Sequence, residues 1–455
     1  AGVAAAPGAA AATLLWLGVG VIGLNAALWL AATAASLAAD RRPPLPAAET
    51  PRLADFRPAP RVTLLAPLYQ EPEMAAHLIA ALSRLDYPPE LLDVKIVLEA
   101  DDRETAEAIA AASPPPFIDV LKAPEGEPRT KPRALNFALD FAKGDIVGIY
   151  DAEDRPPPDQ IRKIVDAFAS APPEVACIQA RLGYYNTEEN WLTRCFEVEY
   201  SSWFDVMLPG LHRLAMPLPL GGTSLFVRRR ALDAVGGWDS HNVTEDADLG
   251  MVLARRGFRT ALCDTLTEEE ASSRPGAWIR QRSRWLKGYL ATWTTHMRRP
   301  GALWRDLGPA GFLGFNAVLL SAALGYLALP LLWLAVVFGA ALTEAGPAAA
   351  HGLHVLGVVS VGALPILAAA ALLGLRRRGR LGLWPVVLTA PFYWILGAAA
   401  AYLAAWELAT APTKWRKTRH GVGRIAAKMR RDAAAPMEKP LCESPTSRLS
   451  GPDPS

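Results

Sequence analysis

Apolar segments without charged side chains lie on both sides of a charged middle segment, and this arrangement limits the possible folds most strongly. No Asp, Glu, Lys or Arg occurs from Ala1 to Ala39, and residues 11–37 are enough to cross about 30 Å of hydrocarbon as one helix. Beyond Pro300 the chain is apolar again over residues 311–342, 352–375 and 381–405. Together with a hydrophobic content of 51%, these runs predict a protein that is partly embedded in a membrane.

The charges beside the apolar runs predict an orientation. Asp40-Arg41-Arg42 follows the first run, and positive charge favours the cytoplasmic side of a membrane. We therefore expect a multi-pass protein of the inner (plasma) membrane whose middle segment is cytoplasmic. The tail from Lys414 to Arg431 carries eight Lys or Arg residues, which suits either an anionic membrane leaflet or a solvated, disordered tail.

The expected number of C-terminal crossings depends on Pro330. If the basic tail returns to the cytoplasm the count must be even, and four crossings result when residues 311–342 form two helices that meet at Pro330. We expect this arrangement, although it places the arginines among residues 376–380 outside, against the positive-inside tendency. The alternative has residues 311–342 as one long helix, residues 352–375 returning, and residues 381–405 lying in the interface.

The charged middle segment alternates between short β-rich runs and helical patterns. Such alternation predicts an α/β fold with a mostly parallel, doubly wound sheet. A Pro-rich stretch before it is typical of a linker. We therefore divide the chain into an N-terminal membrane helix (1–42), a linker (43–60), an α/β domain with an interfacial helix near its end (61–300), a C-terminal membrane region (301–411) and a basic tail (412–455). The predicted strands are residues 62–68, 94–98, 117–121, 146–150 and 175–180.

Polar side chains gather where three of the predicted strands end. Ligands of doubly wound sheets bind beyond the carboxyl ends of the strands, so these side chains predict a shared site. The alternative is that the strands simply end in polar loops. The residues concerned are Tyr69, Gln70 and Glu71, then Glu99, Asp101 and Asp102, and finally Asp151, Glu153 and Asp154.

The acidic cluster after Tyr150 is a candidate metal site. Alternate side chains of an extended segment face the same way, so Asp151 and Glu153 can converge on one cation. Mg2+ or Mn2+ prefers a few carboxylate oxygens together with phosphate oxygens, and either ion would neutralise charge that builds on a diphosphate leaving group. The alternative is a helix start that an Asp caps before Pro156.

A second acidic motif, Thr244-Glu245-Asp246, follows two glycine pairs, at residues 221–222 and 236–237. Asp246 lies where a helix is expected to begin, and a carboxylate near a sugar hydroxyl can act as a general base. Capping explains the same pattern, since Thr244 is a suitable N-cap and acidic residues are favoured in the first turn of a helix.

A third motif, Gln281-Arg282-Ser283-Arg284-Trp285, lies on a probable helix. Gln281, Arg284 and Trp285 fall on one helical face. The Trp ring offers a flat surface for stacking a sugar, and the Arg can bind phosphate with two hydrogen bonds. An interfacial helix that uses Arg and Trp as membrane anchors would look similar.

Other residue patterns exclude several classes. The cysteines are scattered without C-x-x-C spacing, which argues against a zinc site and a disulfide framework. Basic residues flank the apolar runs instead of alternating with aromatic residues, so no nucleic-acid partner is expected. Because residue 1 is not Met and no basic segment precedes the apolar run, we expect native residues upstream of Ala1 and no signal peptide. The cysteines are Cys177, Cys195, Cys263 and Cys442.

Taken in order, the motifs resemble those of family 2 glycosyltransferases of the cellulose synthase and hyaluronan synthase type, over roughly residues 62–290. The resemblance implies a GT-A fold, a nucleotide-sugar donor and an inverting reaction. The T-E-D and Q-x-x-R-W motifs are its most specific part. The matching motifs are Asp101-Asp102, Lys131 with Asn136, Asp151-Ala152-Glu153-Asp154, Thr244-Glu245-Asp246 and Gln281-Arg282-Ser283-Arg284-Trp285.

The resemblance also implies roles for single residues. Asp246 would be the catalytic base, and Trp285 would lie under the terminal sugar of the acceptor. Lys131 and Arg284 would contact the diphosphate. The nucleoside contacts would come from Tyr69, Glu71 and Asp101, and the motif residues Asp102, Asn136, Glu245 and Gln281 would also lie at the substrate site.

By the same resemblance, Asp151 and Glu153 would hold the donor and its Mg2+ or Mn2+. One departure from the family pattern affects this assignment. The usual D-x-D motif is D-x-E here, and Asp154 follows at once. Either Glu153 or Asp154 is therefore the expected second metal ligand.

The resemblance favours a processive β-glycosyltransferase that polymerises sugar, with UDP-glucose as the expected donor, into an exported polysaccharide. Its partners would be the donor, the growing polysaccharide and membrane lipid, with any export partners left open. One alternative is the transfer of a single sugar to a lipid carrier or glycolipid, and another is a transporter or scaffold with an inactive domain. Trp285 favours the processive enzyme, because single-transfer relatives commonly lack the Arg-Trp motif.

Overall fold

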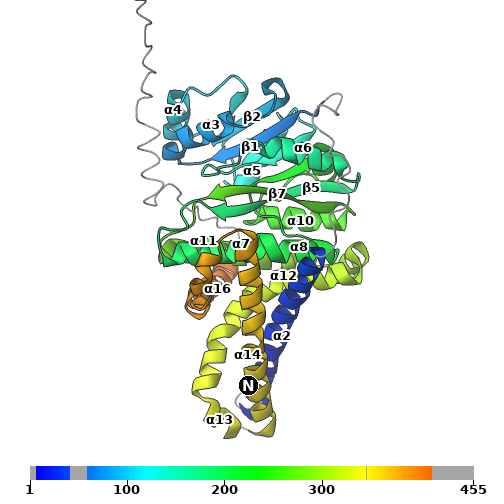
Figure 1. Cartoon of the computed structure of the whole chain (residues 1–455), viewed down its shortest axis with the longest axis vertical. Coiled ribbons are helices and arrows are strands. Elements are labelled where there is room, and N and C mark those ends of the chain that lie inside the picture. The colour runs from blue at the N-terminus through cyan, green and yellow to red at the C-terminus, as the bar shows by residue number, and fades with distance from the viewer. Residues whose placement is uncertain (1–6, 41–58, 345, 412–455) are drawn as a thin grey trace, which may run out of the picture.

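The computed structural model describes residues 7–40, 59–344 and 346–411. Almost all of the predicted linker and the whole predicted basic tail, with Cys442, lie outside the described residues. Figure 1 shows an α/β domain at one end of the molecule, long helices at the other end and a layer of shorter helices between them. The predicted combination of a mixed α/β domain and apolar helices is therefore confirmed.

In the part of the chain that the structure describes, seven strands form one sheet in the order β3-β2-β1-β4-β6-β5-β7. β6 runs antiparallel to both of its neighbours, whereas the other neighbouring strands are parallel. All five predicted strands are present, and β6 and β7 complete the sheet. The strands are β1 (Val62–Leu68), β2 (Leu92–Glu99), β3 (Ile118–Ala123), β4 (Ile146–Ile149), β5 (Val175–Tyr184), β6 (Leu225–Arg228) and β7 (Arg259–Glu269).

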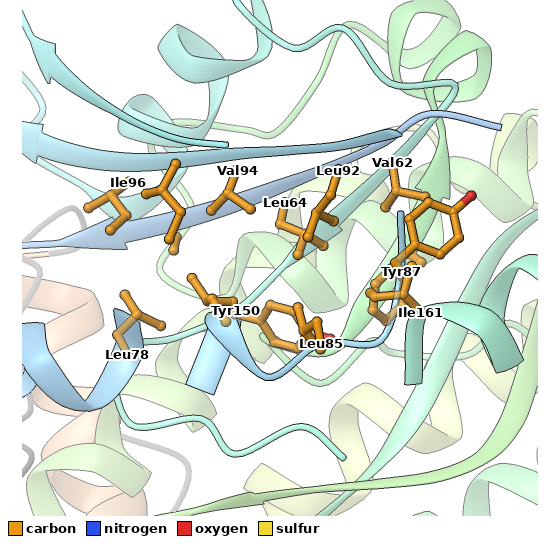
Figure 2. Close-up of a cluster of buried hydrophobic side chains, with 14 of the residues drawn as sticks. Val62, Leu64, Leu78, Leu85, Tyr87, Leu92, Val94, Ile96, Tyr150 and Ile161 are labelled. Carbon is orange, nitrogen blue, oxygen red and sulfur yellow. The ribbon is translucent and has the colours of Figure 1, made fainter. Parts of the chain in front are cut away.

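Helices cover both faces of the sheet, which explains why its central strands read as continuous apolar runs. On one face Leu64 of β1 packs with Leu78 and Ile161 of the covering helices, as Figure 2 shows. On the other face Leu65 of the same strand packs with Leu135. The covering helices are α3 (Ala75–Ser83), α4 (Arg103–Ala111) and α6 (Gln160–Ser170) on the first face, and α5 (Lys131–Leu139), α9 (Arg229–Val235) and α10 (Glu245–Arg255) on the second.

A layer of helices separates the sheet from the long apolar helices (Figure 1). Asn190 begins this layer with a capping box, in which its side chain accepts from the Thr193 amide and the Thr193 hydroxyl accepts from the Asn190 amide. The layer places residues 281–285, the Q-x-x-R-W motif, beside the long apolar helices. Its members are α7 (Trp191–Ser202), the π-helical turn η4 (Trp203–Met207), α8 (Leu208–Arg213) and α11 (Pro275–His296).

Within the described ranges, four helices are long and apolar enough to cross a membrane, judged by length and composition: Gly8–Ala38, Pro300–Ala335, Pro347–Arg377 and Ala390–Thr410. Three of them extend away from the α/β domain, and the fourth packs against α11 and α12 at the domain end (Figure 1). In full, the helices of this region are α2 (Pro7–Asp40), α12 (Pro300–Val337), α13 (Gly339–Glu344), α14 (Pro347–Arg377), the short η5 (Leu381–Leu383) and α15 (Trp384–Val387), and α16 (Ala390–Thr410).

The prediction that residues 311–342 divide into two helices at Pro330 is wrong. α12 continues through Pro330 to Val337, because a proline in a long apolar helix removes one backbone donor without ending the helix. The chain reverses only afterwards, through α13 and Gly346, whose φ of 127° suits glycine. The described C-terminal region therefore contains three long helices instead of four crossings.

α14 returns to the α/β domain, so its C-terminal arginines lie beside that domain and not on the opposite side, as four crossings would require. The side chain of Arg378, 4% exposed, donates to the carboxylates of Asp205, at 2.8 Å, and Glu197, at 3.1 Å. Arg377 donates to the Ser36 hydroxyl of α2 and to the backbone oxygen of Asp205, both at 2.5 Å. One buried cluster therefore joins two membrane helices to the helix layer.

We expect Arg378→Ala to lower the free energy of unfolding by about 3–5 kcal/mol, because Asp205 and Glu197 would stay buried without their cation. Arg380→Ala is the matched control: this side chain is 42% exposed and lies 3.9 Å from Glu188, so its loss is expected to cost less than about 1 kcal/mol. Thermal unfolding of both variants in detergent measures the difference. Equal unfolding temperatures would contradict the importance of the buried cluster.

Candidate active site

One cavity of about 1170 Å3 begins at the carboxyl ends of β1, β2 and β4, where doubly wound sheets bind their ligands. It continues past α7 and α11 and ends between α2, α12 and α14. Ten of the predicted site residues line it: Tyr69, Glu71, Lys131, Asp151, Glu153, Glu245, Asp246, Gln281, Arg284 and Trp285. The acidic loop after β4 and the start of α10 therefore face a common space.

A lysine connects the two acidic motifs. Lys131 is the first residue of α5, and its ammonium donates to Asp151 Oδ1 at 2.5 Å and to the backbone oxygen of Gly222 at 2.9 Å. Burial alone would lower the pKa of Lys131, but the carboxylates of Asp151 and Glu245 outweigh burial and raise it. The side chain therefore stays charged, and a fixed cation at this place is suited to a diphosphate.

Asp151 and Glu153 line the cavity, whereas Asp154 lies behind it. The Asp154 carboxylate accepts hydrogen bonds from the Asp151 amide, at 2.7 Å, and from the Thr223 hydroxyl. Burial raises the pKa of Asp154, and the charge of neighbouring Asp151 raises it further. This geometry favours Glu153 over Asp154 as the second metal ligand. The hydrogen bonds of Asp154 instead stabilise the conformation of the loop after β4.

The acidic residues after β4 fit a metal ion that the diphosphate of a bound nucleotide sugar would help to hold. Among the residues that the structure describes, no three His, Cys, Asp or Glu side chains form a metal site by themselves. Two carboxylates plus diphosphate oxygens are, however, the usual donor set for Mg2+ or Mn2+. Half-buried Glu269 adds a further acid near the loop, and its buried Oε1 has no hydrogen-bond partner among the described atoms. The surplus of carboxylates around Lys131 favours the binding of a cation.

Besides Asp154, three predicted site residues do not line the cavity and instead fix the loops around it. Asp101 forms an ion pair with Arg129 at 2.6 Å on the exposed rim. Asp102 caps α4, with its carboxylate accepting from the amides of Thr105 and Gln70. The third is Asn136, whose side-chain amide donates to the backbone oxygen of Trp238 at 2.7 Å and accepts from the Trp238 amide at 2.9 Å.

α10 begins at Glu245, one residue before Asp246, where the sequence predicts the helix start. Thr244 is the N-cap residue, but within the described part of the chain its side chain makes no capping hydrogen bond, and the acids of the first turn are the part of the capping explanation that the structure retains. Burial raises the pKa of Glu245 to about 7, with a further contribution from the charge of Asp246. Burial also raises the pKa of Asp246. Gly222 (φ 66°) approaches this carboxylate so closely that a Cβ there would lie 3.0 Å from Asp246 Oδ2.

The Q-x-x-R-W motif lies on α11 at the membrane side of the cavity. Gln281 accepts from the Ser272 hydroxyl at 3.1 Å, and Arg284 donates to the backbone oxygen of Val243 at 3.2 Å, directly before the T-E-D motif. The Trp285 ring packs beside Phe196, with the ring centroids 6.0 Å apart. The motif therefore brings a cation and an aromatic surface to the cavity that contains Asp246.

Sequence reasoning missed several residues that line the same cavity. Glu199 of α7 receives two hydrogen bonds from Arg282, at 2.5 and 2.6 Å. Arg129 precedes Lys131 by two residues, and Glu269 ends β7. Glu269 could have been identified as a polar residue at the end of a strand, but β7 was not among the predicted strands. For Glu199, which lies within a helix, the sequence offers no comparable signal.

The sheet order, the acidic loop after β4 and the carboxylates at the start of α10 define a GT-A-like domain that is attached to apolar helices. Residues 146–406, more than half of the chain, match the family model described as "Glycosyl transferase family group 2". The chain belongs to the family 2 glycosyltransferases.

Named relatives and one solved structure show what the chain is similar to. It is 30% identical over 321 residues to a "Beta-monoglucosyldiacylglycerol synthase" of Synechocystis sp., covering 68% of this chain and 64% of that protein. It is also 30% identical over 238 residues to a "Probable glucomannan 4-beta-mannosyltransferase 1" of Arabidopsis thaliana, covering 50% and 43%. The chain thus spans between about two fifths and two thirds of the length of these relatives.

A mannosyltransferase from Pyrobaculum calidifontis, solved in complex with GDP-Man and Mn2+, superposes with a TM-score of 0.52 at 21% identity, covering 85% of this chain and 99% of that one. At this identity the likeness supports the fold alone.

The raised pKa values of Glu245 and Asp246 predict an acid limit of activity well above the pKa of about 4 of an ordinary carboxyl. A carboxylate must be ionised to act as a general base, and burial raises the pKa of Asp246, so we expect kcat/KM to fall with decreasing pH before the range of an ordinary carboxyl is reached. Glu245→Gln removes the neighbouring negative charge and is expected to shift this limit to lower pH. Initial rates from pH 5 to 9 measure it, and a limit near pH 4 in the unchanged chain would contradict the prediction.

Proposed function

We propose that this enzyme transfers one sugar from a nucleotide-sugar donor to a membrane lipid and so makes a glycolipid. The observation that carries the proposal is the continuity of the cavity: Asp246 and Trp285 share it with side chains of α2, α12 and α14. The acyl part of a lipid can stay between the apolar helices while its headgroup hydroxyl extends through this space toward Asp246. The name of the Synechocystis relative, a glycolipid synthase aligned over 68% of the chain, supports the same assignment.

The second candidate is the processive polymerase that the sequence motifs favour. Trp285 supports it, because its ring lies in the cavity where the family resemblance puts the terminal sugar of a polymer. The polysaccharide-related relative, however, aligns over only 50% of the chain. The membrane part of the cavity is lined mainly by aliphatic side chains, which contact an acyl chain better than a glycan. We therefore prefer glycolipid synthesis to processive polymerisation as the proposed function.

In the proposed reaction the acceptor hydroxyl oxygen attacks the anomeric carbon while the bond from that carbon to the diphosphate breaks, with inversion. Asp246 takes the hydroxyl proton onto its carboxylate, and its raised pKa suits a base that works near neutral pH. Lys131 and Arg284 bind the departing diphosphate. Mg2+ or Mn2+ held by Asp151 and Glu153 would supply further neutralisation of the leaving charge.

The proposed location is the inner (plasma) membrane with the catalytic domain in the cytoplasm. The arginines at the end of α14 lie beside this domain and α2 also ends there. The α14 arginines put positive charge on the side of the catalytic domain, which is the usual cytoplasmic pattern. Nucleotide-sugar donors would then reach the cavity from the aqueous side.

We expect Asp246→Asn to lower kcat at least about 100-fold with donor binding retained, because the amide cannot accept the proton. Transfer of radiolabelled glucose from UDP-glucose to dioleoylglycerol in vesicles measures turnover, and UDP-glucose titration calorimetry measures binding. Asp233→Asn, a change at an exposed residue paired with Arg229, is the matched control. Normal turnover in Asp246→Asn would refute the role of the base.

Removal of divalent cations with EDTA is expected to abolish transfer, and added Mn2+ or Mg2+ should restore it, because Asp151 and Glu153 would lack their shared cation. Chromatography of the product decides between the two candidate functions. A lipid that carries one sugar supports glycolipid synthesis. A ladder of longer glycans would contradict glycolipid synthesis and support the processive polymerase.

A further inference from the structure

The side chains that line the cavity change character along its length. At the sheet edge they are mainly charged, including Lys131, Asp151 and Asp246. At the level of α7 and α11 they include aromatic rings, such as Trp285 and Tyr289. Between the long helices the described lining contains no Asp, Glu, Lys or Arg. This order corresponds to a diphosphate-linked sugar, then a headgroup, then a hydrocarbon chain.

The long helices leave a space that is open along one side. Among the described residues α2 packs against both α12 and α14, whereas α12 and α14 do not pack against each other along their lengths. Figure 1 shows these two helices diverging below the helix layer. At the far end Leu15, Ala335 and Leu356 belong to one buried cluster, which closes the space there.

From these observations we propose an acyl-chain binding site between α12 and α14, which the acceptor lipid enters sideways from the bilayer. This inference rests on the proposed function and names the part of the acceptor that the membrane helices bind. On α14 the lining runs from Leu353 to Ala371, a helical length of roughly 27 Å. That length is close to the hydrocarbon thickness of about 30 Å, so a long acyl chain can lie along the whole site.

The aliphatic lining explains why the site selects hydrocarbon. Leu356, Val361 and Leu367 of α14 face the cavity with Leu329 of α12. Contact with an acyl chain leaves no buried polar group unsatisfied, whereas a glycan would lose hydrogen bonds to water without replacing them here. The acyl chain would hold the headgroup hydroxyl near Trp285 and Asp246 by limiting where the lipid can lie.

Two glycines make the site testable without disturbing the helices. A Cβ added at Gly357, which lines the cavity, would meet nothing within 4 Å, so a larger side chain can extend into the open space. Gly362 lies on the same helix and, like Gly357, is exposed, but it does not line the cavity, and a Cβ there also meets nothing within 4 Å. Gly362→Trp is therefore a control for Gly357→Trp with the same change in helix composition.

The experiment uses the full chain in nanodiscs with UDP-glucose and two acceptors, dioleoylglycerol and dihexanoylglycerol. We expect Gly357→Trp to lower kcat/KM for dioleoylglycerol at least tenfold, while its rate with the short-chain acceptor stays within twofold of the unchanged chain. Gly362→Trp should behave as the unchanged chain with both acceptors. If Gly357→Trp transfers sugar to dioleoylglycerol normally, the acyl site is refuted while glycolipid synthesis stands.

Other outcomes separate this inference from the proposed function. If the unchanged chain glycosylates neither diacylglycerol, the proposed function fails and the acyl site fails with it. If it forms a glycan ladder that Gly357→Trp shortens, the space is a glycan passage and the acyl site is refuted.

A second measurement does not depend on turnover. A diacylglycerol with a diazirine at the end of one acyl chain should label peptides of α12 and α14 that line the cavity, and a phosphatidylcholine with the same group should not. Equal labelling by both lipids would overturn the proposal.

Discussion

The buried ion-pair cluster around Asp205 is the interaction on which the arrangement of the whole molecule depends. Its carboxylate accepts from Arg181 of β5 at 2.7 Å and from Arg378 after α14 at 2.8 Å, and Arg378 also reaches Glu197 of α7. Groups with so little exposure are stable as ions only while every partner is present. The sheet, the helix layer and the membrane helices are therefore fixed relative to one another by charges that cannot separate without a large cost.

This fixed arrangement suits the two chemically different substrates of the proposed reaction. In the proposed reaction a strongly charged nucleotide diphosphate sugar and an apolar membrane lipid must meet within bonding distance. The cavity meets both needs by placing Lys131 and Arg284 at the sheet edge and aliphatic side chains between the helices. The reacting atoms would meet at the level of α11, where Trp285 lies. The position of α11 is therefore as important for the reaction as the identity of its residues.

Much of this architecture could be predicted from the sequence, because strands buried on both faces give apolar runs and because polar residues mark their ends. Prediction failed where the outcome depends on partners far away in the chain. Pro330 does not end its helix, since the apolar surroundings continue on both sides of it. The arginines after α14 were expected on the far side of the membrane, because the sequence does not reveal that Asp205 and Glu197 receive them.

Within the site, contacts to distant residues also decide the different positions of Asp154 and Glu153. Both are acidic and adjacent, and only the fold shows that Asp154 turns inward to the Thr223 hydroxyl. Asn136 is a similar case, because its amide binds the backbone of Trp238, which is 102 residues away. β7 carries several polar and charged residues, among them Asp264, so its sequence lacks the apolar run that marks the central strands. Local patterns therefore predict which residue types gather at the site, but not which of them face the cavity.

The aromatic surface on the acceptor side is held by a membrane helix as well as by the catalytic domain. The Arg282 guanidinium lies 4.8 Å from the centre of the Trp285 ring and 4.9 Å from that of Trp278, an arrangement that stabilises a cation against aromatic faces. Glu199 neutralises this cation, and the Tyr393 hydroxyl of α16 donates to Glu199 at 2.6 Å. Because Tyr393, Glu199, Arg282 and Trp285 contact one another in series, a shift of α16 would also disturb the ring beside which the acceptor headgroup would lie. The position of α16 is thereby coupled to the geometry of the acceptor site.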